Sequence, residues 1–227
     1  MSDALLGRRR LVVLASGGGS NLQAVLDACA DGRLNATVVA VLSDRGQAFA
    51  LERADAAGVP AVWMDPKRAD DRRAYDIGLA EAVAAYKPDW IVLAGWMRIL
   101  SAGFLDRFPG RVLNLHPARP GELAGLHAIS RAFDEGLAGL RTSTGVMVHL
   151  VPDEAVDAGP VLGTVDVAIR STDYLVDLER RVHDAEHRLL VDVLAALCRG
   201  RTAESLTRAV LSKSVQPESL LSLEAQP

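Results

Sequence analysis

Residues 11–30 have the sequence LVVLASGGGSNLQAVLDACA, and this stretch decides the fold class. Its first five residues are apolar, which favours a buried strand. A turn with three glycines follows, and from Asn21 to Ala30 apolar residues recur at three- and four-residue spacing, as in a helix facing a core. A strand that passes through a tight turn directly into a helix is typical of the first half of a β-α-β unit.

The same alternation continues along the next ninety residues. Short apolar runs predict buried strands at Leu11–Ala15, Thr37–Leu42, Ala61–Met64, Trp90–Ala94 and Val112–Leu115. Helical spacing predicts helices at Asn21–Ala30, Gln47–Ala57 and Asp71–Tyr86. The sequence therefore predicts an α/β fold with a single doubly wound, mostly parallel sheet, helices on both faces and a Rossmann-like N-terminal half. Ligands bind such sheets beyond the carboxyl ends of the strands, here after Ala15, Ala94 and Leu115.

The C-terminal part has a different pattern. A helix is predicted at Leu126–Phe133 and a long amphipathic helix at Tyr174–Cys198. Between them, the runs Gly145–Val151 and Val161–Ile169 are too close for a crossover helix, which favours an antiparallel addition to the sheet. We expect one domain over residues 1–200, with 201–227 as a peripheral or partly disordered tail.

Composition and charge restrict the class of protein. The chain has 227 residues, of which 49% are hydrophobic and 24% charged, as in a folded globular protein. A formal net charge of −4 gives no overall attraction to nucleic acid or to an anionic membrane. Arg8–Arg10 precede only five apolar residues, too few for a signal peptide or a membrane span, so we expect a cytoplasmic protein. Cys29 and Cys198 lie in apolar helical patterns and are expected to be reduced core residues.

The glycine-rich turn after the first strand is the strongest local signal for ligand binding. Three glycines allow a tight turn, and the free N–H groups at the start of the helix, with Ser20 and Asn21, can hold a phosphate. Leu22 stands where the dinucleotide fingerprint has its third glycine, and no Lys-Ser/Thr follows as in a P-loop. A phosphomonoester therefore fits best, and the alternative is a plain turn with Ser20 as N-cap.

Asn114 and His116 end the fifth predicted strand. Alternation along a strand places both side chains on the same face, where an amide and a protonated imidazole can stabilise an oxyanion. The alternative is a polar pair that caps the following loop. A carboxylate beside His116 would raise the pKa of the imidazole, and the acidic loop 153–157 offers candidates, among which spacing alone does not choose. That loop is also compatible with a solvated hairpin connection.

Residues 183–187, HDAEH, match a zinc-protease signature. That signature needs a further acidic ligand from a later helix, and the remaining 40 residues offer no pattern for one. We therefore assign no metal here and expect solvated or phosphate-adjacent side chains.

Taken together, the motifs resemble the phosphoribosylglycinamide formyltransferase family, the folate-dependent glycinamide ribonucleotide transformylases. The resemblance covers about residues 10–200 and rests on motifs that occur in consistent order, namely SGGGSNLQAVLDAC (16–29), DDRRAYD (70–76), VLAGWMRILS (92–101), NLHP (114–117), GLH (125–127) and VHLVPDEAVDAGPVL (148–162). It implies a formyltransferase that uses 10-formyltetrahydrofolate as co-substrate and formylates the amine of glycinamide ribonucleotide in de novo purine biosynthesis.

The same resemblance implies roles for individual residues. The catalytic positions of the family correspond to Asn114, His116 and Asp157. The remaining implied contacts are with the phosphate of the nucleotide (Gly19, Ser20 and Asn21), its ribose or phosphate region (Glu186), the folate (Met97, Arg98, Ile99 and Leu100), the pteridine ring (Leu93, Phe104 and the loop 153–158) and the glutamate carboxylate of the folate (Arg72).

Two other functions stay open at this point. One is a different formyl-folate reaction, either hydrolysis to formate or formylation of another amine. Formyl-folate hydrolases and methionyl-tRNA formyltransferases carry further domains, which we do not expect in a chain of this length. The other is a folate- or nucleotide-binding homologue without turnover, motivated by unusual residues at 118–121 and 146–147. We expect small-molecule substrates as partners, and the sequence does not predict an oligomeric state.

Overall fold

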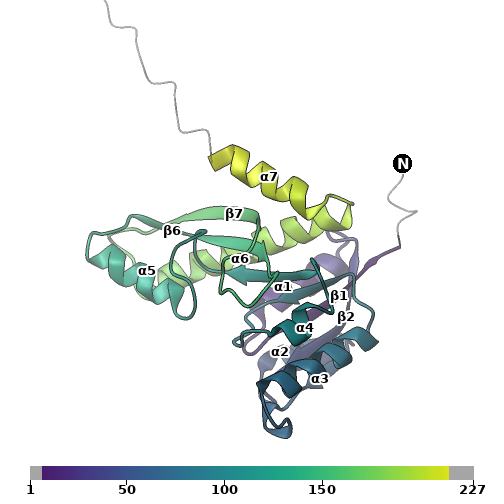
Figure 1. Ribbon diagram of the computed structural model, residues 1–227. Helices are drawn as coiled ribbons and strands as arrows, with labels where there is room; N and C mark the ends of the chain where they lie inside the picture. Colours follow the sequence, from purple (N-terminus) through teal and green to yellow (C-terminus); the bar gives the residue numbers. More distant parts are fainter. Residues whose placement is uncertain (1–6, 215–227) are drawn as a thin grey trace, which may run out of the picture.

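Seven strands form one sheet in the order β3-β2-β1-β4-β5-β6-β7, in a computed structural model that describes residues 7–214 (Figure 1). The first five strands are parallel, β6 pairs antiparallel with β5, and β7 pairs antiparallel with β6. This confirms the predicted mostly parallel sheet with an antiparallel addition. The strands are β1 (Arg9–Leu14), β2 (Ala36–Ser43), β3 (Ala61–Trp63), β4 (Trp90–Leu93), β5 (Val112–His116), β6 (Ser143–Leu150) and β7 (Val161–Ala168).

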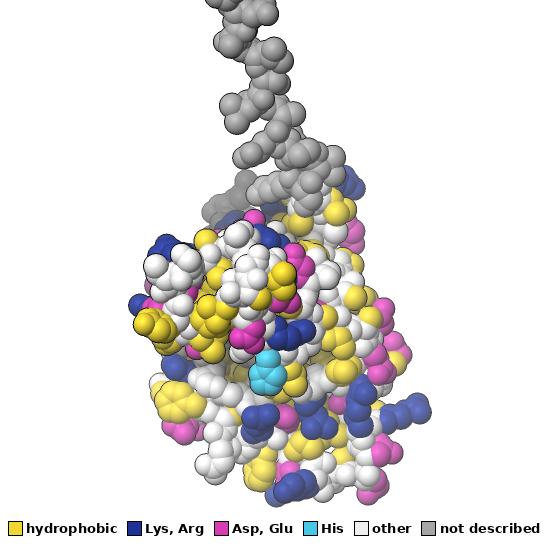
Figure 2. Space-filling model, turned by 90° about the vertical axis from the view of Figure 1, so that its left-hand side faces the viewer, with side chains coloured by type: hydrophobic (Ala, Val, Ile, Leu, Met, Phe, Trp, Pro, Cys, Tyr) yellow, Lys and Arg dark blue, Asp and Glu magenta, His cyan; other side chains and the backbone are white. Residues whose placement is uncertain are grey.

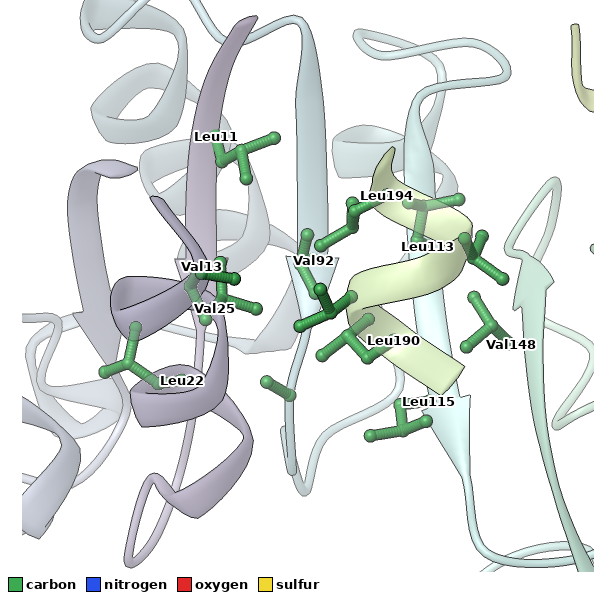
Figure 3. Packing of buried hydrophobic residues seen from close by; sticks show 14 of the residues in the cluster. Leu11, Val13, Leu22, Val25, Val92, Leu113, Leu115, Val148, Leu190 and Leu194 are labelled. Atoms are coloured by element: carbon green, nitrogen blue, oxygen red, sulfur yellow. The ribbon is translucent and has the colours of Figure 1, made fainter. Parts of the chain in front are cut away.

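Helices cover both faces of the sheet. They are α1 (Ser20–Ala30), α2 (Phe49–Ala56), the short 3-10 helix η2 (Pro66–Arg68), α3 (Arg72–Ala85), α4 (Ala102–Leu105), α5 (Ala128–Leu137), α6 (Leu175–Cys198) and α7 (Ala203–Ser214). Alternation along β1 divides the core into two clusters. Leu11 and Val13 pack with α1 and α6 on one face, as Figure 3 shows, whereas Val12 and Leu14 pack with α3 and α4 on the other.

The register of the central strands places their carboxyl ends side by side. Leu14 of β1 lies beside Leu93 of β4, and Leu93 lies beside Asn114 of β5. The glycine-rich turn, the segment after β4 and the end of β5 therefore meet at one edge of the sheet. This is the edge at which ligands bind in doubly wound folds.

Two segments differ from the sequence expectations. Helix α5 begins at Ala128 rather than Leu126, because Gly125 and His127 have left-handed backbone angles (φ 82° and 59°) that do not fit a helix. The helix extends to Leu137. Within the expected tail, residues 203–214 form α7, which packs against β7. Residues 215–227 lie outside the described residues, so the division at residue 200 stays a prediction.

Cys29 and Cys198 are free and buried, as expected for core residues. Burial raises the pKa of both thiols to about 11, so neither is a reactive thiolate near neutral pH. In the part of the chain that the structure describes, we find no helix with the length and apolar character needed to cross a bilayer.

Candidate active site

A cavity of about 740 Å³ opens at the carboxyl ends of β1, β4 and β5. Its walls come from the turn 17–21, the segment 93–100, the end of β5, the segment 125–129, the loop 153–157 and two residues of α6. Figure 2 shows the face of the molecule on which α5 lies, where hydrophobic patches alternate with charged side chains and histidine reaches the surface. The volume is that of a site for a small organic ligand.

The glycine-rich turn forms one end of the cavity. Gly19 has a φ of 71° and precedes α1, and a Cβ at this position would lie 2.8 Å from the Cα of Ala50. Glycine is therefore required here both by backbone conformation and by space. Ser16 accepts a hydrogen bond from the N–H of Met97 (2.9 Å), which fastens the turn to the segment after β4. Ser20 lines the cavity at the start of α1, where free N–H groups favour an anion.

Glu186 brings α6 to this same end. Its carboxylate is buried and accepts hydrogen bonds from Asn21 Nδ2 (3.3 Å) and from Nδ1 of His183 (2.8 Å). The hydrogen bond with Glu186 raises the pKa of His183, which favours the imidazolium. This end of the cavity therefore combines backbone N–H groups, an amide and a histidine whose pKa is raised.

The HDAEH signature does not form a metal centre in the described structure. Across residues 7–214, no group of three or more His, Cys, Asp or Glu side chains is arranged to hold a metal ion. Burial lowers the pKa of His187, the last residue of the signature. His183 and Glu186 instead pair with each other at the cavity wall.

The side chains of Asn114, His116 and Asp157 meet in the middle of the cavity. Nδ2 of Asn114 donates to Asp157 Oδ1 (3.0 Å), and Nδ1 of His116 lies 3.3 Å from Asp157 Oδ2. Asp157 is thus the carboxylate of the loop that faces His116, whereas Asp153 accepts a hydrogen bond from the N–H of Ala155 within the loop. The left-handed backbone of Asp157 (φ 53°) turns its side chain into the cavity wall.

The expected increase in the pKa of His116 is wrong for this structure. Burial disfavours the imidazolium and lowers the pKa, and the nearby charge of Asp157 offsets this only in part. Asp157 shows the opposite balance. Burial opposes its ionisation, but the neighbouring His149, the hydrogen bond from the N–H of Gly125 and the charge of His116 lower its pKa. The pair therefore combines a carboxyl group whose ionised form is favoured with an imidazole whose neutral form is favoured.

His149 is part of this cluster, and the sequence did not reveal it. It lies opposite Asn114 in the antiparallel pairing of β5 and β6, with Nε2 3.1 Å from Asn114 Nδ2 and 3.5 Å from Asp157 Oδ1. Its Nδ1 lies 2.8 Å from the carbonyl oxygen of Leu150, so Nδ1 carries the proton and Nε2 accepts from Asn114. A buried histidine within an apolar strand was the available signal. Both amide hydrogens of Asn114 are thus engaged, and a ligand oxygen must take one of them over.

The other end of the cavity is mainly apolar. Its lining includes five residues predicted to contact the folate, which are Leu93, Met97, Arg98, Ile99 and Leu100. Met97 and Ile99 are each about half exposed although both are apolar, which is typical of a site that a flat hydrophobic ligand covers. The guanidinium of Arg98 lies over the ring of Tyr75 (4.9 Å).

Two residues predicted for this end lie outside the cavity wall. Phe104 is fully buried and packs on Phe108, with ring centroids 5.1 Å apart, because α4 turns its apolar side toward the core. Phe104 does not line the cavity, and its expected contact with the pteridine ring stays a prediction. Arg72, at the start of α3, lies 3.1 Å from Glu154 and 3.8 Å from Asp76. Its proposed contact with a ligand carboxylate stays a prediction.

Comparison with known proteins places the chain among enzymes. The family described as formyl transferase matches residues 9–194. Phosphoribosylglycinamide formyltransferase of Escherichia coli is 40% identical over 191 residues, which cover 84% of this chain and 88% of that protein. The Schizosaccharomyces pombe enzyme of the same name is 44% identical over 196 residues, covering 81% of this chain and 94% of that protein.

Solved structures agree with the sequence relatives. Glycinamide ribonucleotide transformylase 1 from Symbiobacterium toebii is 40% identical with a TM-score of 0.81, and the match covers 86% of this chain and 90% of that one. Phosphoribosylglycinamide formyltransferase from Bacillus halodurans is 32% identical with a TM-score of 0.79, covering 85% and 96%. The residues that the formyl transferase family matches, 9–194, include all seven strands and every segment that lines the cavity.

Proposed function

Because the chain belongs to the formyl transferase family, and to the phosphoribosylglycinamide formyltransferases within it, we propose that it moves the formyl group of 10-formyltetrahydrofolate to the amine of glycinamide ribonucleotide. The chain is a formyl-transferring enzyme of purine biosynthesis. The nucleotide occupies the end of the cavity formed by Gly19, Ser20, Asn21 and Glu186, and the folate occupies the apolar end beside residues 93–100.

The convergence of Asn114, His116 and Asp157 between these two ends carries the proposal. A phosphate-binding turn alone would fit many ligands, and an apolar pocket alone would fit many more. Two substrates that enter from opposite ends bring the amine and the formyl carbon together where the polar cluster lies. That arrangement supports transfer between two bound molecules.

The reaction passes through a tetrahedral adduct. The neutral amine attacks the formyl carbon, a new C–N bond forms, and the formyl oxygen becomes an oxyanion. Asn114 Nδ2 and the Nε2–H of protonated His116, which faces the carbonyl of Leu123 in the free enzyme, donate hydrogen bonds to this oxygen. The bond to the folate nitrogen then breaks. A proton leaves the amine and one reaches the folate nitrogen, so the atoms balance without a further reactant.

Asp157 allows His116, although buried, to carry the proton that it donates to the oxyanion. Burial lowers the pKa of His116, so an imidazolium without a carboxylate beside it would be rare at neutral pH. The carboxylate at 3.3 Å favours the protonated form and fixes the orientation of the ring. The developing oxyanion favours the protonated form further, so His116 binds its proton more strongly as the adduct forms.

A spectrophotometric transfer assay with both substrates tests the proposal. Wild-type protein is expected to release tetrahydrofolate only when the nucleotide is present. His116→Ala removes one donor to the oxyanion and is expected to lower kcat by about 10²–10³-fold. Arg107→Gln, a change of an exposed residue in the turn after α4, serves as a control for handling and folding.

Two results would overturn the assignment. Formate release at the wild-type rate without any amine would indicate a hydrolase. Tight binding of both substrates, measured by calorimetry, without any transfer would indicate a binding protein. Normal kcat in His116→Ala would leave the reaction in place but reject the mechanism.

A further inference from the structure

A short backbone segment, residues 123–125, touches both members of the His116–Asp157 pair. The carbonyl oxygen of Leu123 lies 3.1 Å from His116 Nε2, and the N–H of Gly125 donates to Asp157 Oδ2 (2.8 Å). We call residues 123–125 the strap. Its position therefore bears on the orientation of the histidine ring and of the carboxylate at the same time.

The backbone of the strap adopts strained conformations, which contacts with neighbouring residues must stabilise. Leu123 has a φ of 46°, in the left-handed region that a branched side chain rarely adopts, and Gly125 has a φ of 82°. His127, just beyond it, is also left-handed (φ 59°). A conformation of this kind persists only where surrounding contacts fix it.

Arg131 supplies that contact. Its Nη2 donates to the carbonyl oxygens of both Leu123 (2.6 Å) and Ala124 (2.7 Å). The residue lies in the first turn of α5, where its own N–H donates to the carbonyl of His127 (3.0 Å), so the guanidinium is anchored to a regular helix. Among the residues that the structure describes, no carboxylate forms an ion pair with Arg131, and its Nε is buried without a hydrogen-bond partner. The two strap carbonyls are thus its polar partners.

We propose that Arg131 is a positioning residue of the active site, which holds the strap so that the carbonyl of Leu123 orients His116 for the reaction. Arg131 does not line the cavity, so it acts through the backbone rather than on a substrate. The inference deepens the proposed function and rests on it, because it takes His116 as the catalytic histidine.

The hydrogen-bond geometry around His116 shows why the strap matters. Nδ1 faces Asp157 and Nε2 faces the carbonyl of Leu123, and both of these partners are acceptors. A neutral imidazole has one N–H and satisfies only one of them, whereas the imidazolium satisfies both. A carbonyl oxygen has two lone pairs, so Leu123 can accept from Arg131 and from His116 together. Holding the carbonyl in place therefore favours the charged form of the ring.

The charge of Arg131 also affects the pKa of His116, in the direction opposite to the effect of the Leu123 carbonyl. The titratable and charged groups that face the ring are Asp157 from the loop after β6, His149 from β6 and Arg131 from α5. The positive charge of Arg131 lowers the pKa of His116, while the Leu123 carbonyl that it holds raises that pKa, and the effect of the carbonyl is the larger. Loss of the side chain thus has two possible outcomes of opposite sign. A positioning role predicts a lower pKa, and a role through charge alone predicts a higher one.

Titration of the His116 imidazole by NMR, in wild type and Arg131→Met, separates these outcomes and does not depend on turnover. We expect the pKa of His116 to fall in Arg131→Met, because the released strap no longer offers its carbonyl. We expect a smaller fall in Arg131→Lys, because a single nitrogen makes both contacts and an ammonium retains the needed donors. An unchanged or higher pKa in Arg131→Met would overturn the proposal.

Steady-state kinetics provide the second measurement. Arg131→Met is expected to lower kcat by about 10- to 100-fold, as small misplacements of catalytic groups do, while KM for either substrate changes less than about threefold. Arg131→Lys should recover most of the loss, and Arg107→Gln should match wild type. A rise in KM with normal kcat would overturn the positioning role.

Failures of the two proposals remain distinguishable. If wild-type protein does not transfer the formyl group, the proposed function fails, and the NMR titration still decides whether Arg131 controls His116. If thermal unfolding shows that Arg131→Met does not fold, Arg131→Ala, which also removes both hydrogen bonds to the strap, carries the test. An alanine variant that folds but shows neither a lower pKa of His116 nor a lower kcat would also overturn the proposal.

Discussion

Arg72 and Glu154 form an ion pair of 3.1 Å that ties the start of α3 to the loop between β6 and β7. Glu154 also accepts a hydrogen bond from the N–H of Ala102 (3.1 Å), so its carboxylate joins three segments around the apolar end of the cavity. Arg72 is the residue that we expect to meet the glutamate carboxylate of the folate. In the proposed complex, the carboxylate of Glu154 would compete with that of the folate for Arg72.

Glu154→Gln is therefore expected to bind the folate substrate more tightly. The amide keeps the shape of the side chain but no longer competes for Arg72 as a charge. Both partners are about half exposed, and such pairs contribute at most about 1 kcal/mol, so KM for the folate should fall by about fivefold or less. Steady-state kinetics with a folate analogue that lacks the glutamate moiety are the control. An equal change in KM for that analogue would show that Arg72 does not read the carboxylate.

Asp157→Asn should shift the pH dependence of the reaction. The negative charge of Asp157 raises the pKa of His116 against the effect of burial, so its removal lowers that pKa further. The protonated histidine then persists only to a lower pH. The alkaline limb of the profile of kcat/KM against pH should therefore move to lower pH, and activity at neutral pH should fall by at least about tenfold.

The neighbouring acidic residue provides the comparison for that experiment. Asp153→Asn is expected to have a much smaller effect, because Asp153 contacts its own loop and not His116. A wild-type profile in Asp157→Asn combined with lost activity in Asp153→Asn would mean that the wrong carboxylate has been chosen.

His183 predicts a pH dependence at the nucleotide end. The hydrogen bond with Glu186 raises the pKa of His183, and the charges of Glu179 and Asp184 act in the same direction. The imidazolium is thus present below the raised pKa and is lost as pH increases through it, so KM for the nucleotide should increase over that range. His183→Gln should show a higher KM at low pH and a flatter dependence. The phosphate itself titrates near pH 6, so only the difference between the two proteins is diagnostic. Identical profiles would exclude His183 from phosphate binding.

Gly19→Ala is expected to damage both stability and nucleotide binding. A side chain at φ 71° is strained, and its Cβ would approach the Cα of Ala50 to 2.8 Å. We expect a loss of about 1–3 kcal/mol in the free energy of unfolding, visible as a Tm lower by several degrees, and a higher KM for the nucleotide. Gly18→Ala is the matched control for stability, because nothing lies within 4 Å of a Cβ there and its φ is not positive. Equal Tm values for the two variants would contradict this account.

Local sequence patterns were sufficient for the sheet but not for the loops that enclose the site. Strands β1 to β5 lie within two residues of their predicted bounds, because buried parallel strands need continuous apolar runs that end at polar turn residues. The start of α5 was predicted two residues too early, because the spacing of apolar residues does not reveal the left-handed backbone of His127, the residue before the helix.

Within the site, side chains on regular elements were easier to predict than their environment. Alternation along β5 put Asn114 and His116 on one face, and the structure brings both to Asp157. The contribution of His149 depends on the register between β5 and β6, which no local pattern contains. The sign of the shift in the His116 pKa depends on how much protein surrounds the ring, and that quantity exists only in the folded chain.

The chain order reverses between the neighbouring strands β1 and β4, so separate stretches of the chain encode the two ends of the cavity. In the proposed arrangement, an inhibitor that imitates the folate would contact mainly residues 93–100 and the loop 153–157. Mutations that confer resistance to such a compound can accumulate there without altering the first β-α turn or α6. Such mutations would therefore change nucleotide affinity little. A compound that also contacts the end of β5 would differ, because resistance mutations there would alter Asn114 or His116 and lower activity.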